Sequence, residues 1–145
     1  MSSRRGAAGY GAAVRVLVLV GLVGCGGGVK TYPVNGKVVL EDGDVQQLAG
    51  SHVELMLESD PLVRASGRIR SDGTFGVETL HEGRILKGAR EGTYQARIIP
   101  ADEDDEGRPR RGPLPIHKRF LDFKTAGLSV KVPTEGEVIL KVSRR

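Results

Sequence analysis

Hydrophobic and polar residues alternate with a period of two along most of the chain after residue 33. Such alternation is typical of strands that bury one face and expose the other. The pattern predicts seven short strands, at residues 34–40, 53–58, 63–70, 74–79, 93–99, 128–132 and 138–142. We find neither a convincing amphipathic helix nor an internal repeat.

Turn-forming residues separate the predicted strands. Ser-Asp-Gly at 71–73 lies between two extended segments, and Asp-Gly in that position favours a hairpin because glycine adopts the positive φ that the turn requires. Residues 41–44 (Glu-Asp-Gly-Asp) repeat this pattern after the first strand, and 133–136 (Pro-Thr-Glu-Gly) separate the last two. The sequence therefore predicts an all-β, seven-stranded antiparallel β-sandwich with a core of Val, Leu and Ile.

The segment "VRVLVLVGLVGCGGGVKTYP" at residues 14–33 raises two alternatives. The first is a phosphate-binding loop, in which a glycine must precede the lysine. Val29 occupies that position before Lys30. The following Tyr32-Pro33 pair favours extended backbone where a helix should begin. The segment is thus a poor match to a nucleotide-binding motif.

The second alternative is an export signal. Arg4, Arg5 and Arg15 precede or flank an apolar run at 16–23, which has the length of a signal sequence but is too short for a membrane span. The sequence predicts that residues 1–24 form a signal peptide.

Leu22, Val23, Gly24 and Cys25 resemble the lipobox of bacterial lipoproteins. The resemblance implies that a peptidase cleaves before Cys25, that a diacylglycerol alkylates its Sγ, and that the new amino group is often acylated. Residues 25–30 would then be a lipidated cysteine with a glycine-rich tether. Cys25 is the only cysteine, which excludes an intramolecular disulfide. The alternatives are a plain secretory signal beside an unmodified thiol, or a cytosolic protein.

Removal of the signal changes the charge balance. The chain has 22 basic and 18 acidic residues, and three of the basic residues lie in the predicted signal, which leaves a nearly neutral protein. No tryptophan and no basic stripe with interleaved aromatics are present. The sequence therefore predicts no nucleic-acid partner. Residues 31–145 have the size of one domain.

The domain resembles a known family in four segments: "TYPVNGKVVL" followed by Leu-Ala-Gly-Ser-His-Val at 48–53, "GRIRSDGTFGVETL", "GAREGTYQARIIP" and "TAGLSVKV". Together they are similar to the carboxypeptidase regulatory-like, or transthyretin-like, domains of small bacterial lipoproteins. The resemblance covers residues 31–145. It implies a seven-stranded sandwich in the cell envelope that acts as an accessory module, without catalytic residues or a cofactor.

The loop at 101–115 is the most highly charged segment. Asp102, Asp104 and Glu106 precede a glycine and are similar to the start of a calcium loop, yet the twelfth position, where a glutamate belongs, is Pro113. Three arginines at 108–111 compete with a cation. We predict a solvated loop with opposed charges, and the three acids remain weak metal candidates.

Other chemically interesting residues have structural explanations. His52, His81 and His117 lack metal-ligand spacing, and no serine lies in a nucleophile elbow. Tyr94 after Gly92-Thr93 could stack on a sugar, but we predict a packed tyrosine whose hydroxyl bonds nearby backbone. The sequence therefore favours a protein that is not an enzyme.

These observations predict a lipid-anchored module on the outer face of the cytoplasmic membrane or in the outer membrane. Its role would be binding or scaffolding, and its partner an envelope protein or polysaccharide. The contact would lie at the loop 101–115 or at an exposed strand edge. The alternative is a domain that binds a small ligand, either a carbohydrate or Ca²⁺.

Overall fold

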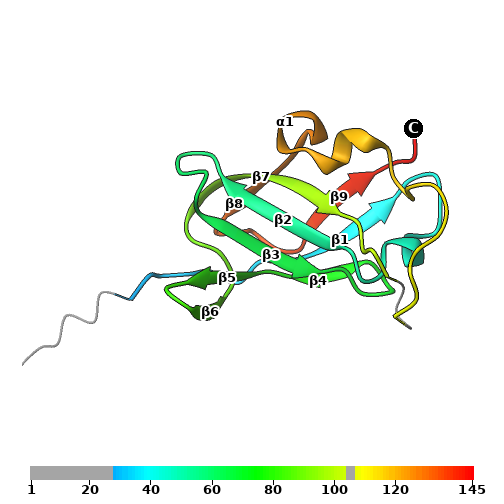
Figure 1. Cartoon of the computed structure of the whole chain (residues 1–145). Coiled ribbons are helices and arrows are strands. Elements are labelled where there is room, and N and C mark those ends of the chain that lie inside the picture. The colour runs from blue at the N-terminus through cyan, green and yellow to red at the C-terminus, as the bar shows by residue number, and fades with distance from the viewer. Residues whose placement is uncertain (1–27, 104–106) are drawn as a thin grey trace, which may run out of the picture.

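The computed structural model describes residues 28–103 and 107–145, and these residues form an all-β fold (Figure 1). The described residues contain nine strands: β1 (Asn35–Leu40), β2 (His52–Leu57), β3 (Arg64–Arg68), β4 (Thr74–Gly76), β5 (Glu78–His81), β6 (Arg84–Lys87), β7 (Gly92–Ile99), β8 (Leu128–Val132) and β9 (Val138–Val142). Three short helical segments accompany them: the 3-10 helices η1 (Val45–Leu48) and η2 (Lys118–Leu121), and the α-helix α1 (Phe123–Ala126).

The strands form two sheets. The larger sheet has six strands in the order β6-β5-β3-β2-β7-β8, with every pair antiparallel. The smaller sheet has the order β4-β1-β9, in which β1 runs antiparallel to β4 and parallel to β9. The strands β6, β8, β4 and β9 are therefore the outermost strands of the two sheets.

One core lies between the sheets. Alternate residues of β1 are buried, as are alternate residues of β2, so Val38 and Leu40 of the small sheet meet Val53 and Leu55 of the large sheet in a single hydrophobic cluster. Most members are aliphatic, as the sequence predicts, and they are joined by three fully buried aromatic side chains: Phe75, Tyr94 and Phe120.

The all-β class is confirmed, but the predicted seven-strand, fully antiparallel arrangement is wrong in three respects. The predicted strand at 74–79 is divided, because the chain passes from the small sheet to the large one at Val77, whose N–H bonds the carbonyl of Val34 (3.0 Å). A further strand, β6, pairs with β5. The pair β1–β9 is parallel, whereas the sequence predicts only antiparallel pairs, because alternation shows which residues are buried and not which strand lies alongside.

Of the two predicted Asp-Gly turns, the structure contains the one at 71–73 but not the hairpin at 41–44. Gly73 has the expected positive φ of 85°, and Asp72 closes its turn by accepting bonds from the Thr74 hydroxyl (2.7 Å) and N–H (2.9 Å), which lower the pKa of that carboxyl. This turn joins strands of different sheets. After β1, by contrast, the predicted hairpin is absent: Asp44 caps η1 through the N–H of Gln46 (2.9 Å), and the chain crosses to the large sheet.

Candidate functional site

The predicted signal peptide and lipobox lie outside the described residues. Leu22, Val23, Gly24 and the predicted lipid attachment residue Cys25 therefore remain sequence predictions. Within residues 28–103 and 107–145, no helix is both long and apolar enough to cross a bilayer.

The chain joins the domain beside the segment that follows β6. Tyr32 and Ala89 exchange two backbone hydrogen bonds (2.8 and 2.9 Å), and the Thr31 hydroxyl donates to the carbonyl of Lys87 (2.8 Å). Gly88 allows this approach, because a Cβ there would lie 2.0 Å from the Tyr32 carbonyl oxygen. The chain is thus fixed to the domain from residue 31, directly after the predicted tether at 25–30.

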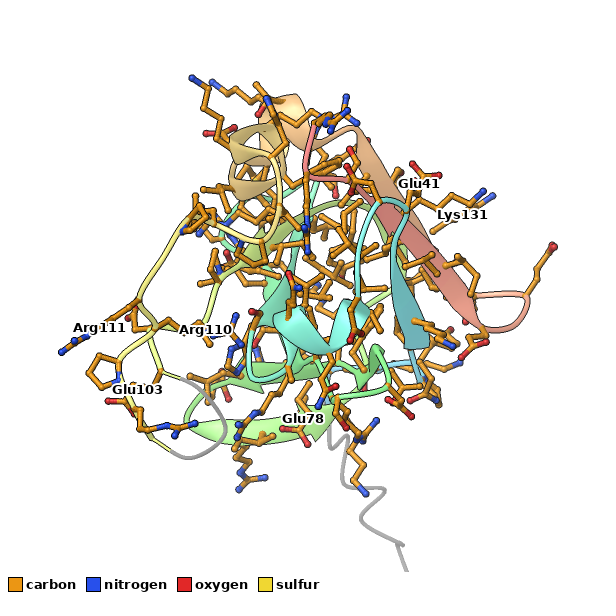
Figure 2. All side chains as sticks on the ribbon, turned by 90° about the vertical axis from the view of Figure 1, so that its right-hand side faces the viewer. Glu41, Glu78, Glu103, Arg110, Arg111 and Lys131 are labelled. Atoms are coloured by element: carbon orange, nitrogen blue, oxygen red, sulfur yellow. The ribbon has the colours of Figure 1, made fainter. Side chains whose placement is uncertain are left out.

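The charged loop at 101–115 is partly held against the body of the domain. The N–H of Arg110 donates to the Asp102 carbonyl (2.8 Å), and its guanidinium donates to the carbonyls of Gln47 and Ala49 at the end of η1. Figure 2 shows Arg110 directed toward η1 and Arg111 directed away from the domain. Arg110 therefore fixes the loop and is not a freely available cation.

The metal candidates in this loop are only partly placed. Asp102 is exposed, and Asp104 and Glu106 lie outside the described residues. Among the residues that the structure describes, no group of three acidic, histidine or cysteine side chains is arranged to hold a metal ion. Weak calcium binding at the loop stays an untested prediction.

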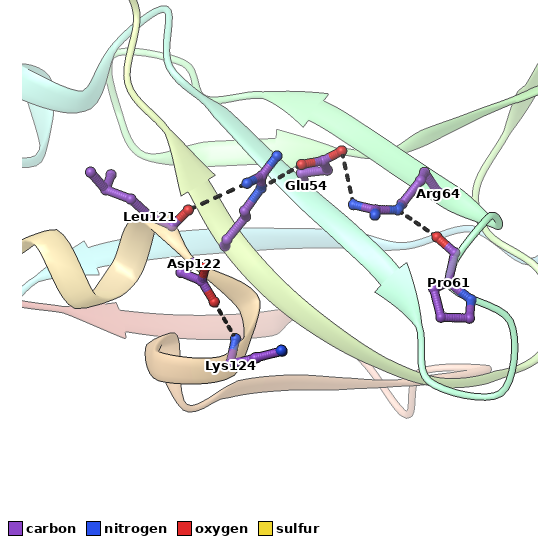
Figure 3. A network of polar contacts seen from close by, with 7 residues as sticks. Glu54, Pro61, Arg64, Leu121, Asp122 and Lys124 are labelled. Atoms are coloured by element: carbon purple, nitrogen blue, oxygen red, sulfur yellow. Dashed lines mark hydrogen bonds and ion pairs between the residues drawn. The ribbon is translucent and has the colours of Figure 1, made fainter.

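A polar cluster lies on the outer face of the large sheet (Figure 3). Glu54 on β2 stands directly opposite Arg97 on β7, and their side chains form an ion pair of 2.6 Å between Oε2 and Nε. Arg64 on β3 reaches the other carboxylate oxygen at 3.4 Å and donates to the Pro61 carbonyl (2.8 Å). One carboxylate thus joins two arginines from the strands on either side.

Phe123 completes this cluster from the first residue of α1. The guanidinium carbons of Arg64 and Arg97 each lie 4.7 Å from the centre of its ring. Asp122 caps α1 by accepting from the N–H of Lys124 (2.8 Å), which sets the helix over the sheet. Because each arginine is engaged by the carboxylate and the ring together, the cluster fixes α1 to the sheet.

An open groove runs between β8 and β9, the outermost strands of the two sheets. Its volume is about 910 Å³, and it is lined by β8, by the connection 133–137 and by the start of β9. The lining includes the exposed charges of Lys131, Glu135 and Glu137 and the exposed apolar side chain of Ile139. No strand in the described part of the chain pairs with these two edges. The groove combines them with mixed polar and apolar surface, and it is our candidate binding site.

The other singled-out residues have separate positions. His52 lies on β2 and His81 at the end of β5, while Nδ1 of His117 caps η2 by accepting from the N–H of Arg119 (3.2 Å). Tyr94 is fully buried and its hydroxyl donates to the Arg90 carbonyl (2.9 Å), which confirms the predicted packed tyrosine.

Comparisons with known proteins add no identification: no family model, no curated protein and no solved structure matches this chain.

Proposed function

We propose that this protein is a lipid-anchored module of the bacterial cell envelope, held to a membrane through Cys25. It has no catalytic role, and it binds an extended segment of another envelope protein in the groove between β8 and β9. We also assign its domain to the carboxypeptidase regulatory-like, transthyretin-like class, on the sequence segments named above.

The lipid anchor is supported by the N-terminal sequence. A basic start, a short apolar run and Leu-Val-Gly-Cys at 22–25 occur in the order that export and lipidation require. Two or three acyl chains would hold the protein stably, whereas one chain binds a membrane only marginally. The domain begins a few residues later, so it would remain close to the bilayer.

The binding role rests on one observation, the open groove at the meeting of two sheet edges. A strand at a sheet edge presents unpaired backbone groups to which an extended peptide can add as a further strand. In the groove, Ile139 offers an apolar contact of 48% exposure, and Lys131 and Glu137 offer charges of both signs. Such a surface suits an extended peptide whose side chains alternate between sheet and solvent.

The proposal is tested by crosslinking in intact cells. A photoreactive residue at Glu137, in the groove, should form an adduct with one envelope protein, and Ile139→Arg should abolish that adduct without lowering the melting temperature. The matched control places the same photoreactive residue at Leu114, which is also exposed, at 50%, but lies in the loop 101–115.

Each outcome decides between the candidate surfaces. An adduct at position 114 alone would make the loop the contact and overturn the groove. An adduct that disappears on glycan digestion would identify a polysaccharide partner and overturn the protein partner. If no adduct forms at position 137 and none forms at position 114, the binding role is overturned.

A further inference from the structure

The three most exposed large apolar side chains among the described residues are Leu62, Leu80 and Ile85, at 92%, 72% and 69% exposure. Leu80 on β5 stands directly opposite Ile85 on β6, so the two form one apolar pair on the outer face of the sheet. Leu62 lies in the turn between β2 and β3. Exposed apolar side chains that gather in a patch mark a surface that contacts another protein or a membrane.

These side chains lie at the end of the domain where the N-terminal segment enters. Because Ser66 of β3 pairs antiparallel with Glu78 of β5, the tip of the β5–β6 hairpin points the same way as the β2–β3 turn. Figure 1 shows this turn, the hairpin and the chain from residue 28 at one end of the molecule. Gly28 and Val29 line a small hollow together with Arg84 and Leu86 of the hairpin.

The position of Cys25 sets how far this end can be from a membrane. Gly28 is three positions after Cys25 in the chain. A fully extended chain spans at most roughly 3.6 Å per residue, or about 11 Å over these three steps. The hairpin beside Gly28 is therefore within reach of any bilayer in which the acyl chains of Cys25 are inserted.

We propose that the β5–β6 hairpin and the β2–β3 turn dock on the bilayer surface and insert Leu62, Leu80 and Ile85 among the lipids. The inference rests on the lipid anchor proposed above. It adds an orientation of the domain, in which the end that carries the N-terminal segment faces the membrane. Amphipathic protein surfaces bind at the interface through the apolar area that they bury there.

The charges of the hairpin indicate that apolar contact dominates. Arg84 and Lys87 of the hairpin are matched by Glu78 and Glu82, and the β2–β3 turn contributes Glu58 and Asp60, all of them exposed. A surface without a basic excess gains little from anionic headgroups, whose attraction acts on clusters of basic residues. Docking should therefore be similar on zwitterionic and on mixed anionic bilayers.

Tryptophan fluorescence provides the test, because the chain contains no tryptophan. Residues 25–145 carrying Ile85→Trp are coupled through the Cys25 thiol to a maleimide lipid in phosphatidylcholine vesicles, with and without brominated acyl chains. The control is Leu114→Trp, an exposed apolar position in the loop after β7. This coupling anchors the domain whether or not cells lipidate Cys25, so the test is separate from that of the proposed anchor.

The expected result is emission at shorter wavelength and quenching by brominated lipid for the Ile85→Trp protein, and neither effect for the Leu114→Trp protein. Adding Leu62→Ser and Leu80→Ser to Ile85→Trp should return the emission to its solvent-like wavelength without changing the melting temperature. Equal behaviour of the two tryptophan variants on vesicles would overturn the inference. So would a wavelength shift that follows protein concentration without lipid, because the hairpin would then contact a second copy of the chain.

Discussion

The Glu54 cluster gives a quantitative prediction, because one carboxylate contacts two arginines of different geometry. The Glu54–Arg97 pair is short, at 2.6 Å, and the two side chains are 17% and 32% exposed. The Glu54–Arg64 pair is longer, at 3.4 Å, and Arg64 is 41% exposed. Two double-mutant cycles measure these pairs: one combines Glu54→Ala with Arg97→Ala, and the other combines Glu54→Ala with Arg64→Ala.

The expected coupling free energies differ. A hydrogen bond to a charged group contributes roughly 1.5–3 kcal/mol, and because a third of Arg97 is in solvent we expect about 1–2 kcal/mol for Glu54–Arg97. Exposed ion pairs contribute about 0–1 kcal/mol, which is the range expected for Glu54–Arg64. Loss of the Phe123 contact, 4.7 Å from both guanidinium groups, occurs in each arginine variant and cancels within each cycle.

Urea unfolding of residues 25–145, followed by circular dichroism, measures both couplings. The m-value should stay constant, since these substitutions remove surface contacts and not the core. The reasoning is refuted if the Arg64 coupling equals or exceeds the Arg97 coupling, because the directly opposed, less exposed pair would then not be the stronger one.

Two further predictions concern the packing of the sandwich. Gly67→Ala should destabilise the domain by about 1–3 kcal/mol, because a Cβ there would lie 2.3 Å from the Gly76 carbonyl oxygen. In thermal unfolding, its melting temperature should lie clearly below that of the control variant Ser66→Ala, which changes a neighbouring exposed side chain. For Tyr94, burial raises the pKa of the hydroxyl. The stability that this contributes is present below the unfolded pKa, near 10, and is lost as the pH rises toward the folded pKa. Melting temperature should therefore fall above pH 10, and Tyr94→Phe should reduce that dependence; an unchanged alkaline profile would exclude Tyr94 as its source.

Local alternation predicted the strands whose two faces differ most in burial. β1, β2 and β7 each bury every second residue, and the sequence places all three within a residue or two. The sequence does not predict β6, because its residues show no alternation of hydrophobic and polar side chains. Arg84, Ile85 and Lys87 are exposed, and only Leu86 is half-buried. A strand that buries little of either face gives no periodic signal.

Contacts between distant segments could not be predicted in the same way. The parallel pair joins residues near 38 to residues near 140, and no local pattern specifies that partner. The cluster at Glu54 likewise combines β2, β3, β7 and α1. Its only sequence signal is that Glu54 and Arg97 occupy outward positions of their strands, which is typical of surface charges anywhere.

Of the predicted functional residues, Tyr94 could be placed from local sequence, whereas the loop acids could not. Tyr94 was placed correctly because a glycine before a strand and a buried tyrosine belong to one local motif. For the loop acids the sequence offers only their spacing, and spacing does not reveal that Arg110 fixes the loop to η1.

Intact-mass analysis of the protein purified from detergent-solubilised cells tests the proposed lipid anchor at Cys25. We expect a chain that begins at Cys25 and carries a diacylglycerol, with or without a further acyl group. We also expect the Cys25→Ser protein to be absent from the membrane fraction. A chain that retains residues 1–24, or that begins at an unmodified Cys25, would contradict it.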